Sequence, residues 1–138
     1  MENVELMITR PDYDLTTSYL FQWSNEIKNV AEKRHGNKVI DLKREKVTRK
    51  NSESYITNSN PRLLILNGHG NDLSICGHKN EIIFDGKNVQ LFRNRIVYAR
   101  SCRSAAVLGK MAVQNNEATA FLGYRQDFVF PYDKNKTA

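Results

Sequence analysis

Five short apolar runs stand out along the chain, and each has the length of a β-strand. Most of these runs are continuously apolar, which is typical of strands covered on both faces of a sheet. The pattern therefore predicts a buried sheet of five strands. They span residues 4–8, 38–42, 62–66, 95–99 and 118–124.

A long amphipathic segment follows the first apolar run. From Leu15 to Ala31, apolar residues recur every three to four positions, so a helix there has one apolar face. Asp12 or Asp14 is expected to cap the start of this helix, and Gly36 is expected to end it. The pattern thus predicts one long helix between the first two strands.

Two further helices and a hairpin are predicted between the remaining strands. One helix is expected over 48–58 with Thr48 as its cap. Another is expected over 103–115, where small residues allow a close approach to a sheet. The Asp-Gly pair at 85–86 is a good turn signal, so a hairpin is predicted over 82–92.

This order of elements predicts an α/β fold with a mostly parallel central sheet and right-handed crossovers. In such sheets, ligands bind beyond the carboxyl ends of the strands. His69 lies just beyond the third apolar run, and Cys102 lies just beyond the fourth. If those two strands are neighbours, both side chains emerge at one rim of the sheet.

A histidine and a cysteine at one rim are typical of nucleophilic catalysis. A thiolate of Cys102 can attack an acyl carbon while His69 moves the proton from the thiol to the leaving amine. Cys102 precedes the predicted helix over 103–115, whose first amides favour a thiolate and help to hold an oxyanion. Gly70 lacks a side chain, so its backbone N–H can approach a substrate carbonyl closely.

Purely structural roles also explain His69 and Cys102. A histidine between glycines is also found in structural turns, and a cysteine at a strand end is often a small buried apolar residue. A second alternative is a zinc site, because His69, Cys76, His78 and Cys102 are ligand types that zinc prefers. The tight Cys-x-His spacing and the lack of a CxxC or HxxxH pair disfavour zinc, and no metal is expected.

Composition places the chain among globular proteins. Its 138 residues suit one domain, and they are 40% hydrophobic and 26% charged. No apolar run is long enough for a membrane span, and no secretory signal is recognisable at the N-terminus. Two cysteines do not make a disulfide framework, so a reducing cytoplasm is the expected location.

The positive charge is concentrated in one window. The net charge is +6, and residues 33–50 hold eight basic and two acidic residues, which equals the whole excess. A solvated helix end and loop is the favoured interpretation. Binding to nucleic acid or to an acidic partner is the alternative. Nucleic acid is disfavoured because no aromatic residue interleaves with the basic ones.

Three motifs resemble those of the caspase-like cysteine peptidases, the group that includes caspases, gingipains, separases and CHAT domains. They are "ILNGHG", "IVYARSCRSAAVLG" and "ATAFLGY". The resemblance implies a three-layer α/β/α fold in one caspase-like domain, which is a whole enzyme or part of a longer one. It also implies a dyad of nucleophile Cys102 and general acid/base His69, with an oxyanion hole made by the Gly70 and Cys102 amides. No cofactor is implied.

The same resemblance implies a peptide or protein substrate. Members of the group continue into a further strand and specificity loops, so an additional subunit or an oligomer is expected to complete the pocket. Where such enzymes cleave after a basic residue, an acidic side chain in the pocket binds that residue. Asp72 and Asp127 are the nearest acids to the candidate dyad by sequence position. A solvated loop acid or a cap is the alternative for each. A catalytically idle interaction module of the same fold is the alternative for the whole chain.

Overall fold

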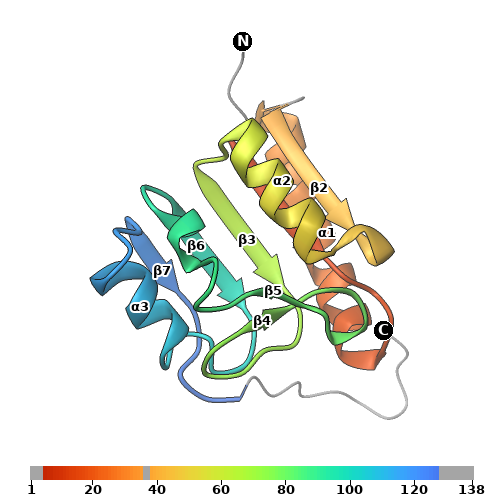
Figure 1. Cartoon of the computed structure of the whole chain (residues 1–138). Coiled ribbons are helices and arrows are strands. Elements are labelled where there is room, and N and C mark those ends of the chain that lie inside the picture. The colour runs from red at the N-terminus through yellow and green to blue at the C-terminus, as the bar shows by residue number, and fades with distance from the viewer. Residues whose placement is uncertain (1–4, 36–37, 128–138) are drawn as a thin grey trace.

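The computed structural model describes residues 5–35 and 38–127. Five strands form one sheet in the order β2-β1-β3-β6-β7, and every neighbouring pair is parallel (Figure 1). The predicted α/β class with a mostly parallel central sheet is therefore confirmed. The strands of this sheet are β1 (Leu6–Arg10), β2 (Val39–Lys43), β3 (Leu63–Asn67), β6 (Ile96–Arg100) and β7 (Ala120–Leu122).

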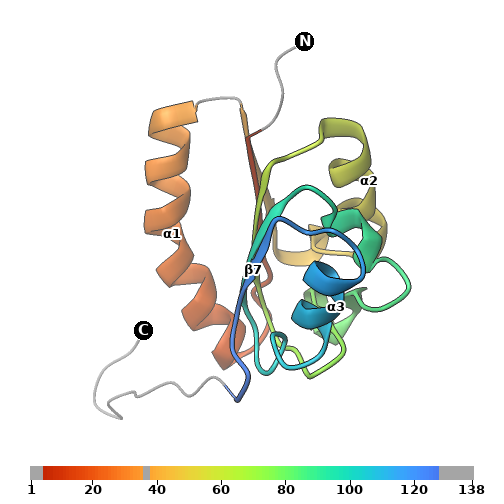
Figure 2. The ribbon, with the colours of Figure 1, turned by 90° about the vertical axis from the view of Figure 1, so that its left-hand side faces the viewer.

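Three α-helices lie on the two faces of the sheet. Figure 2 shows α1 on one side of the sheet and α2 and α3 on the other side. The described helices include no segment that is long and apolar enough to cross a membrane. The helices are α1 (Leu15–His35), α2 (Arg49–Ser59) and α3 (Leu108–Gln114), with short 3₁₀ helices at Arg44–Lys46, His78–Asn80 and Val89–Phe92.

The core divides into two clusters because successive side chains of a strand point to opposite faces. On β3, Leu64 and Leu66 belong to a large cluster with residues of α2 and α3. Ile65, which lies between them in sequence, belongs to a smaller cluster with Ala31 of α1. Both faces of β3 are therefore covered, as its continuous apolar run predicted.

The first two helices form close to their predicted positions. Asp14 rather than Asp12 caps α1, since its carboxylate accepts a hydrogen bond from the Thr17 N–H at 2.9 Å. Thr48 caps α2 by accepting a hydrogen bond from the Asn51 N–H at 3.1 Å. The expected helix end at Gly36 lies outside the described residues, as does the first residue of the strand predicted over 4–8.

The predicted hairpin over 82–92 is wrong. The antiparallel pair is formed by β4 (Ile75–Cys76) and β5 (Ile82–Phe84), and the Asp-Gly turn comes after β5. The Asp85 carboxylate accepts a hydrogen bond from the Lys87 N–H at 2.9 Å, which turns the chain into the 3₁₀ helix at Val89–Phe92. The turn signal is thus real, but it leads into a helix and not into a second strand.

The predicted start of the third helix is also wrong, because α3 begins at Leu108 and not at 103. Arg103 has a φ of 55°, which a right-handed helix excludes. Its N–H donates to the carbonyl of Gln126 at 3.1 Å, and the Ala105 N–H donates to the carbonyl of Tyr124 at 3.0 Å. Contacts with the segment after β7 therefore replace the first turn of the predicted helix.

The basic window does not form one cluster. Lys33 and Arg34 lie at the end of α1, whereas Lys43 and Arg44 lie at the carboxyl end of β2 (Figure 1). Arg49 is engaged in ion pairs on its own helix and with the turn after β5, as described below. The window thus divides between the two ends of β2.

Candidate active site

The two candidate catalytic residues follow neighbouring strands. β3 pairs with β6 in parallel, and the last residues in register are Asn67 and Arg100. The ladder extends one step further, because the Gly68 N–H donates to the Arg100 carbonyl at 3.4 Å. His69 and Cys102 each stand two residues beyond the last registered pair. The two strands are neighbours, which is the condition under which the sequence places both side chains at one rim.

His69 is held by the residue that caps α1. Its Nε2 lies 2.7 Å from Oδ2 of Asp14, and the two side chains are 34% and 39% exposed. The ring of Tyr13 packs edge-on against the imidazole with centroids 6.3 Å apart. Sequence reasoning assigned Asp14 only to helix capping, so this anchor for His69 was missed.

The electrostatics favour an ionised Asp14. Burial disfavours its charged form, but hydrogen bonds from Thr17 and His69 outweigh burial, and the pKa of Asp14 lies below its usual value. Burial, followed by the charge of Asp14, raises the pKa of Tyr13 to about 12. Tyr13 therefore stays a neutral phenol, whose hydroxyl hydrogen-bonds with Asn80.

Gly70 packs directly against the cysteine segment. A Cβ at this position would lie 1.9 Å from Oγ of Ser101 and 3.2 Å from the carbonyl oxygen of Cys102. No L side chain fits there without a shift of the neighbouring chain. The close approach that the sequence predicted for Gly70 is therefore made with the Cys102 segment itself.

The hydrogen bonds around Gly70 leave its N–H available. Gly70 forms an antiparallel bridge with Ile75, in which Cys76 N–H donates to the His69 carbonyl at 2.8 Å. On the other side of the bridge, the Asn71 N–H donates to the Ser74 carbonyl at 3.0 Å. The Gly70 N–H itself donates to no residue in the described part of the chain. It is free to donate to a bound carbonyl.

The two cysteines differ in environment. Cys102 is half-buried and lies in the loop between β6 and α3, and Cys76 is buried in β4. Burial raises the pKa of the Cys76 thiol, although a hydrogen bond with Ser74 opposes this. Because α3 begins six positions after Cys102, its N-terminal amides do not support a thiolate there as predicted. Sequence reasoning was wrong on this point.

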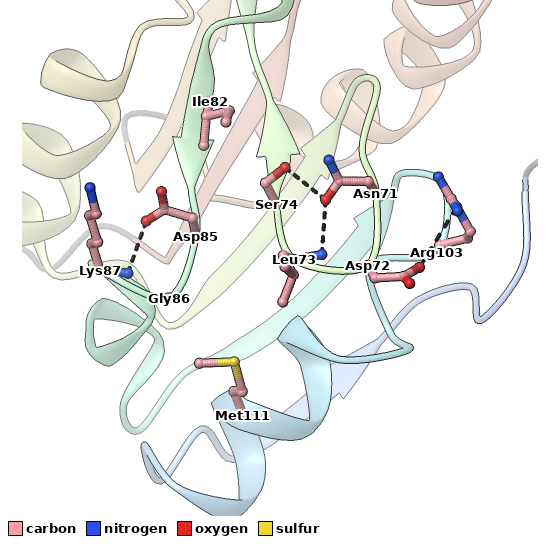
Figure 3. A pocket seen from close by; sticks show the side chains of 10 residues that line it. All are labelled: Asn71, Asp72, Leu73, Ser74, Ile82, Asp85, Gly86, Lys87, Arg103 and Met111. Atoms are coloured by element: carbon pink, nitrogen blue, oxygen red, sulfur yellow. Dashed lines mark hydrogen bonds and ion pairs between the residues drawn. The ribbon is translucent and has the colours of Figure 1, made fainter.

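Asp72 and Asp127, the two acids expected to bind a basic substrate residue, both form ion pairs with Arg103. Nε of Arg103 lies 3.0 Å from Asp127 and 3.7 Å from Asp72. Their negative charge is therefore already paired with a cation. The side chain of Asp72 also lines the cavity beside the rim, where it faces Arg103 (Figure 3).

The proposed zinc ligands are not gathered into a metal site. Across residues 5–35 and 38–127, no group of three or more His, Cys, Asp or Glu side chains is arranged to hold a metal ion. His69 is instead paired with Asp14, and Cys76 is enclosed in the core. The four side chains considered as zinc ligands are therefore not gathered at one point in the described part of the chain.

A cavity of about 630 Å³ lies next to this rim (Figure 3). Its wall starts at the residue after Gly70 and includes the residue after Cys102. It therefore adjoins both halves of the candidate active site. The lining consists of Asn71, Asp72, Leu73, Ser74, Ile82, Asp85, Gly86, Lys87, Arg103 and Met111.

Comparisons with known proteins add no family assignment. No protein-family model matches the chain, and no similar curated protein or solved structure is found. The caspase-like resemblance therefore depends on the three sequence motifs alone.

Proposed function

We propose that this protein is a cysteine-dependent endopeptidase of the caspase-like type, in which Cys102 is the nucleophile and His69 is the general acid/base. One observation carries the proposal: the parallel pairing of β3 with β6 leaves both residues at equivalent positions beyond adjacent strand ends. Carboxyl ends of parallel strands are where α/β proteins bind their ligands.

The contact with Asp14 supports a defined tautomer of His69. An ionised carboxylate only accepts hydrogen bonds, so the imidazole nitrogen that faces Asp14, Nε2, carries a proton. Nδ1 then remains for proton exchange with the thiol and the leaving amine. Asp14 is in this scheme a positioning residue, which acts through His69 and does not touch the substrate.

The acylation step follows from these roles. Nδ1 of His69 takes the proton of the Cys102 thiol, and Sγ forms a bond to the carbonyl carbon of the scissile peptide. The carbonyl oxygen gains negative charge, which the N–H of Gly70 and that of Cys102 stabilise. The C–N bond then breaks, and His69 gives its proton to the leaving amine.

Deacylation repeats these steps with water. His69 removes a proton from the attacking water, whose oxygen bonds to the thioester carbon. The C–S bond breaks, the sulfur recovers its proton from His69, and the carboxylic acid product leaves. The cycle needs no cofactor. It needs a reduced thiol, which suits the cytoplasmic location that we propose.

The substrate is proposed to be a peptide or protein. An idle interaction module of the same fold is the second candidate, and the exposed sheet face near β7 favours it. Ile96 of β6 is 42% exposed and Leu122 of β7 is 49% exposed. Such apolar exposure suits contact with an additional subunit or with another copy of the chain.

Cleavage of a peptide library by matched variants tests the proposal. We expect the wild type to cleave and both Cys102→Ala and His69→Ala to lose at least about a hundredfold in kcat/KM. Cys76→Ala is the control, since it removes the other thiol and should retain activity. Circular dichroism should show all variants folded.

Two results would decide against an enzyme. Equal turnover by wild type and Cys102→Ala would exclude the proposed nucleophile. Absence of cleavage, together with a binding partner that Cys102→Ala and His69→Ala both retain, would establish the interaction module instead.

A further inference from the structure

The cavity beside the rim is lined by residues that directly follow Gly70 and Cys102 in the sequence. Its loop wall, residues 71–74, starts immediately after Gly70, and Arg103 follows Cys102 directly. The Leu108 N–H donates to the Asp72 carbonyl at 2.8 Å, which ties this loop to the start of α3. A peptide whose carbonyl lies between Gly70 and Cys102 would therefore place a neighbouring side chain at the mouth of this cavity.

The surface exposed inside the cavity is mostly apolar. Leu73 is 58% exposed and Ile82 is 43% exposed, although both are large aliphatic residues. Met111 of α3 lies opposite the loop in Figure 3. A Cβ added to Gly86 would lie 3.2 Å from the terminal methyl of Met111, so these two lining residues lie close together.

The carboxylates and the Asn71 side-chain oxygen in the lining already have partners. Asp85 accepts from the guanidinium of Arg49 at 3.1 Å. Oδ1 of Asn71 accepts hydrogen bonds from the Leu73 N–H at 2.9 Å and from the Ser74 hydroxyl at 3.0 Å. The hydrogen bond between Asp85 and the Lys87 N–H is also drawn in Figure 3.

Charge therefore disfavours a basic guest. The carboxylates of Asp72 and Asp85 each face an arginine, so a basic substrate side chain would have to displace Arg103 or Arg49. The ammonium of Lys87 adds a further positive charge to the lining. An apolar side chain would instead cover exposed aliphatic surface without breaking any of these contacts.

Building on the proposed function, we propose that this cavity binds a bulky apolar side chain of the substrate. Leucine, methionine and phenylalanine are the residue types that fit, at a position within two or three residues of the scissile bond. The volume lies in the range usual for ligand pockets. This specificity differs from recognition of a basic residue by Asp72 or Asp127.

A peptide library randomised at three positions on either side of the scissile bond tests this inference. At one of these positions, we expect kcat/KM for leucine, methionine or phenylalanine to exceed that for lysine or aspartate by about tenfold to a hundredfold. Ile82→Asp should lower this preference by about tenfold. Leu73→Asp, in the exposed loop, should do the same without disturbing a strand.

Val113→Asp is the matched control, because Val113 is 44% exposed, close to the 43% of Ile82, and lies outside the cavity. It should leave the preference unchanged. Cleavage without an apolar preference would overturn the inference and leave the peptidase proposal standing. The same holds for a preference that survives both Ile82→Asp and Leu73→Asp. Absence of all cleavage by the wild type would overturn both proposals.

Discussion

Replacing Gly70 by alanine tests how tightly the two halves of the candidate site are packed. The added methyl would lie 1.9 Å from Oγ of Ser101, 3.0 Å from the carbonyl oxygen of Ser74 and 3.2 Å from that of Cys102. The first distance is more than an ångström inside van der Waals contact, so the Ser101 hydroxyl has to move, and the two carbonyl contacts press on the backbone of both segments. Gly70 does not have a positive φ, and the cost is therefore steric.

Such overpacking typically costs about 1–3 kcal/mol. With a urea slope of about 2 kcal/mol per M, a loss of 2 kcal/mol lowers the unfolding midpoint by about 1 M. Turnover should fall as well, because the displaced groups include the carbonyl of Cys102. Gly86→Ala is the control, since its methyl would meet only the flexible end of Met111 at 3.2 Å.

Ser101→Ala should rescue much of the stability lost in Gly70→Ala. The Ser101 hydroxyl is buried and hydrogen-bonds to no described residue, so removing it costs little. The double variant keeps only the contacts at 3.0 and 3.2 Å, and the coupling energy of the cycle should exceed about 0.5 kcal/mol. A steric clash at Gly70 would be refuted by a urea midpoint of Gly70→Ala equal to that of the wild type. It would also be refuted if adding Ser101→Ala restored none of the lost stability.

Three further predictions concern single side chains. Asp14→Asn keeps the helix cap but should lower kcat by about tenfold to a hundredfold, with KM little changed, because the charge that orients His69 is lost. The lowered pKa of Asp14 gives the wild type stability that is present above about pH 4 and is lost as the pH falls through that pKa. Urea midpoints of wild type and Asp14→Asn should therefore converge below pH 4, and midpoints that stay equally far apart would contradict the assignment. Limited iodoacetamide should label Cys102 before Cys76, since burial raises the pKa of the Cys76 thiol, and mass spectrometry showing the reverse order would argue against Cys102 as nucleophile. Arg10 is only 1% exposed, and its guanidinium lies 3.0 Å from the Asp41 carboxylate on β2. Arg10→Met should therefore lower the free energy of unfolding in urea by about 3–5 kcal/mol. An unchanged midpoint would show that this ion pair contributes nothing to stability.

The sheet was predictable because its signal is local. Continuous apolar runs such as Leu63–Leu66 encode burial on both faces, and strands separated by helices are expected to run parallel. Parallel strands end at one edge, so the placement of His69 and Cys102 followed from their sequence positions. The capping of α2 by Thr48 was equally local and was also found.

What sequence reasoning missed depends on contacts between distant segments. The pair of Asp14 and His69 joins positions 55 residues apart, and no periodicity reports it. The pattern over 103–115 favours a helix from its start, but hydrogen bonds to Tyr124 and Gln126 hold the first residues in turns. Likewise, β4 has only two residues, too few to produce a recognisable strand pattern.

The dependence of the cysteine loop on the segment after β7 sets an order of assembly. During synthesis, which proceeds at about 5–20 residues per second, the contact between Asp14 and His69 becomes available as soon as β3 can pair with β1. The loop that carries Cys102 lacks its hydrogen-bond partners until Gln126 has left the ribosome. A growing chain can therefore form the contact between Asp14 and His69 before the loop that carries Cys102 is held in place, so the proposed dyad is complete only when the sheet is nearly built.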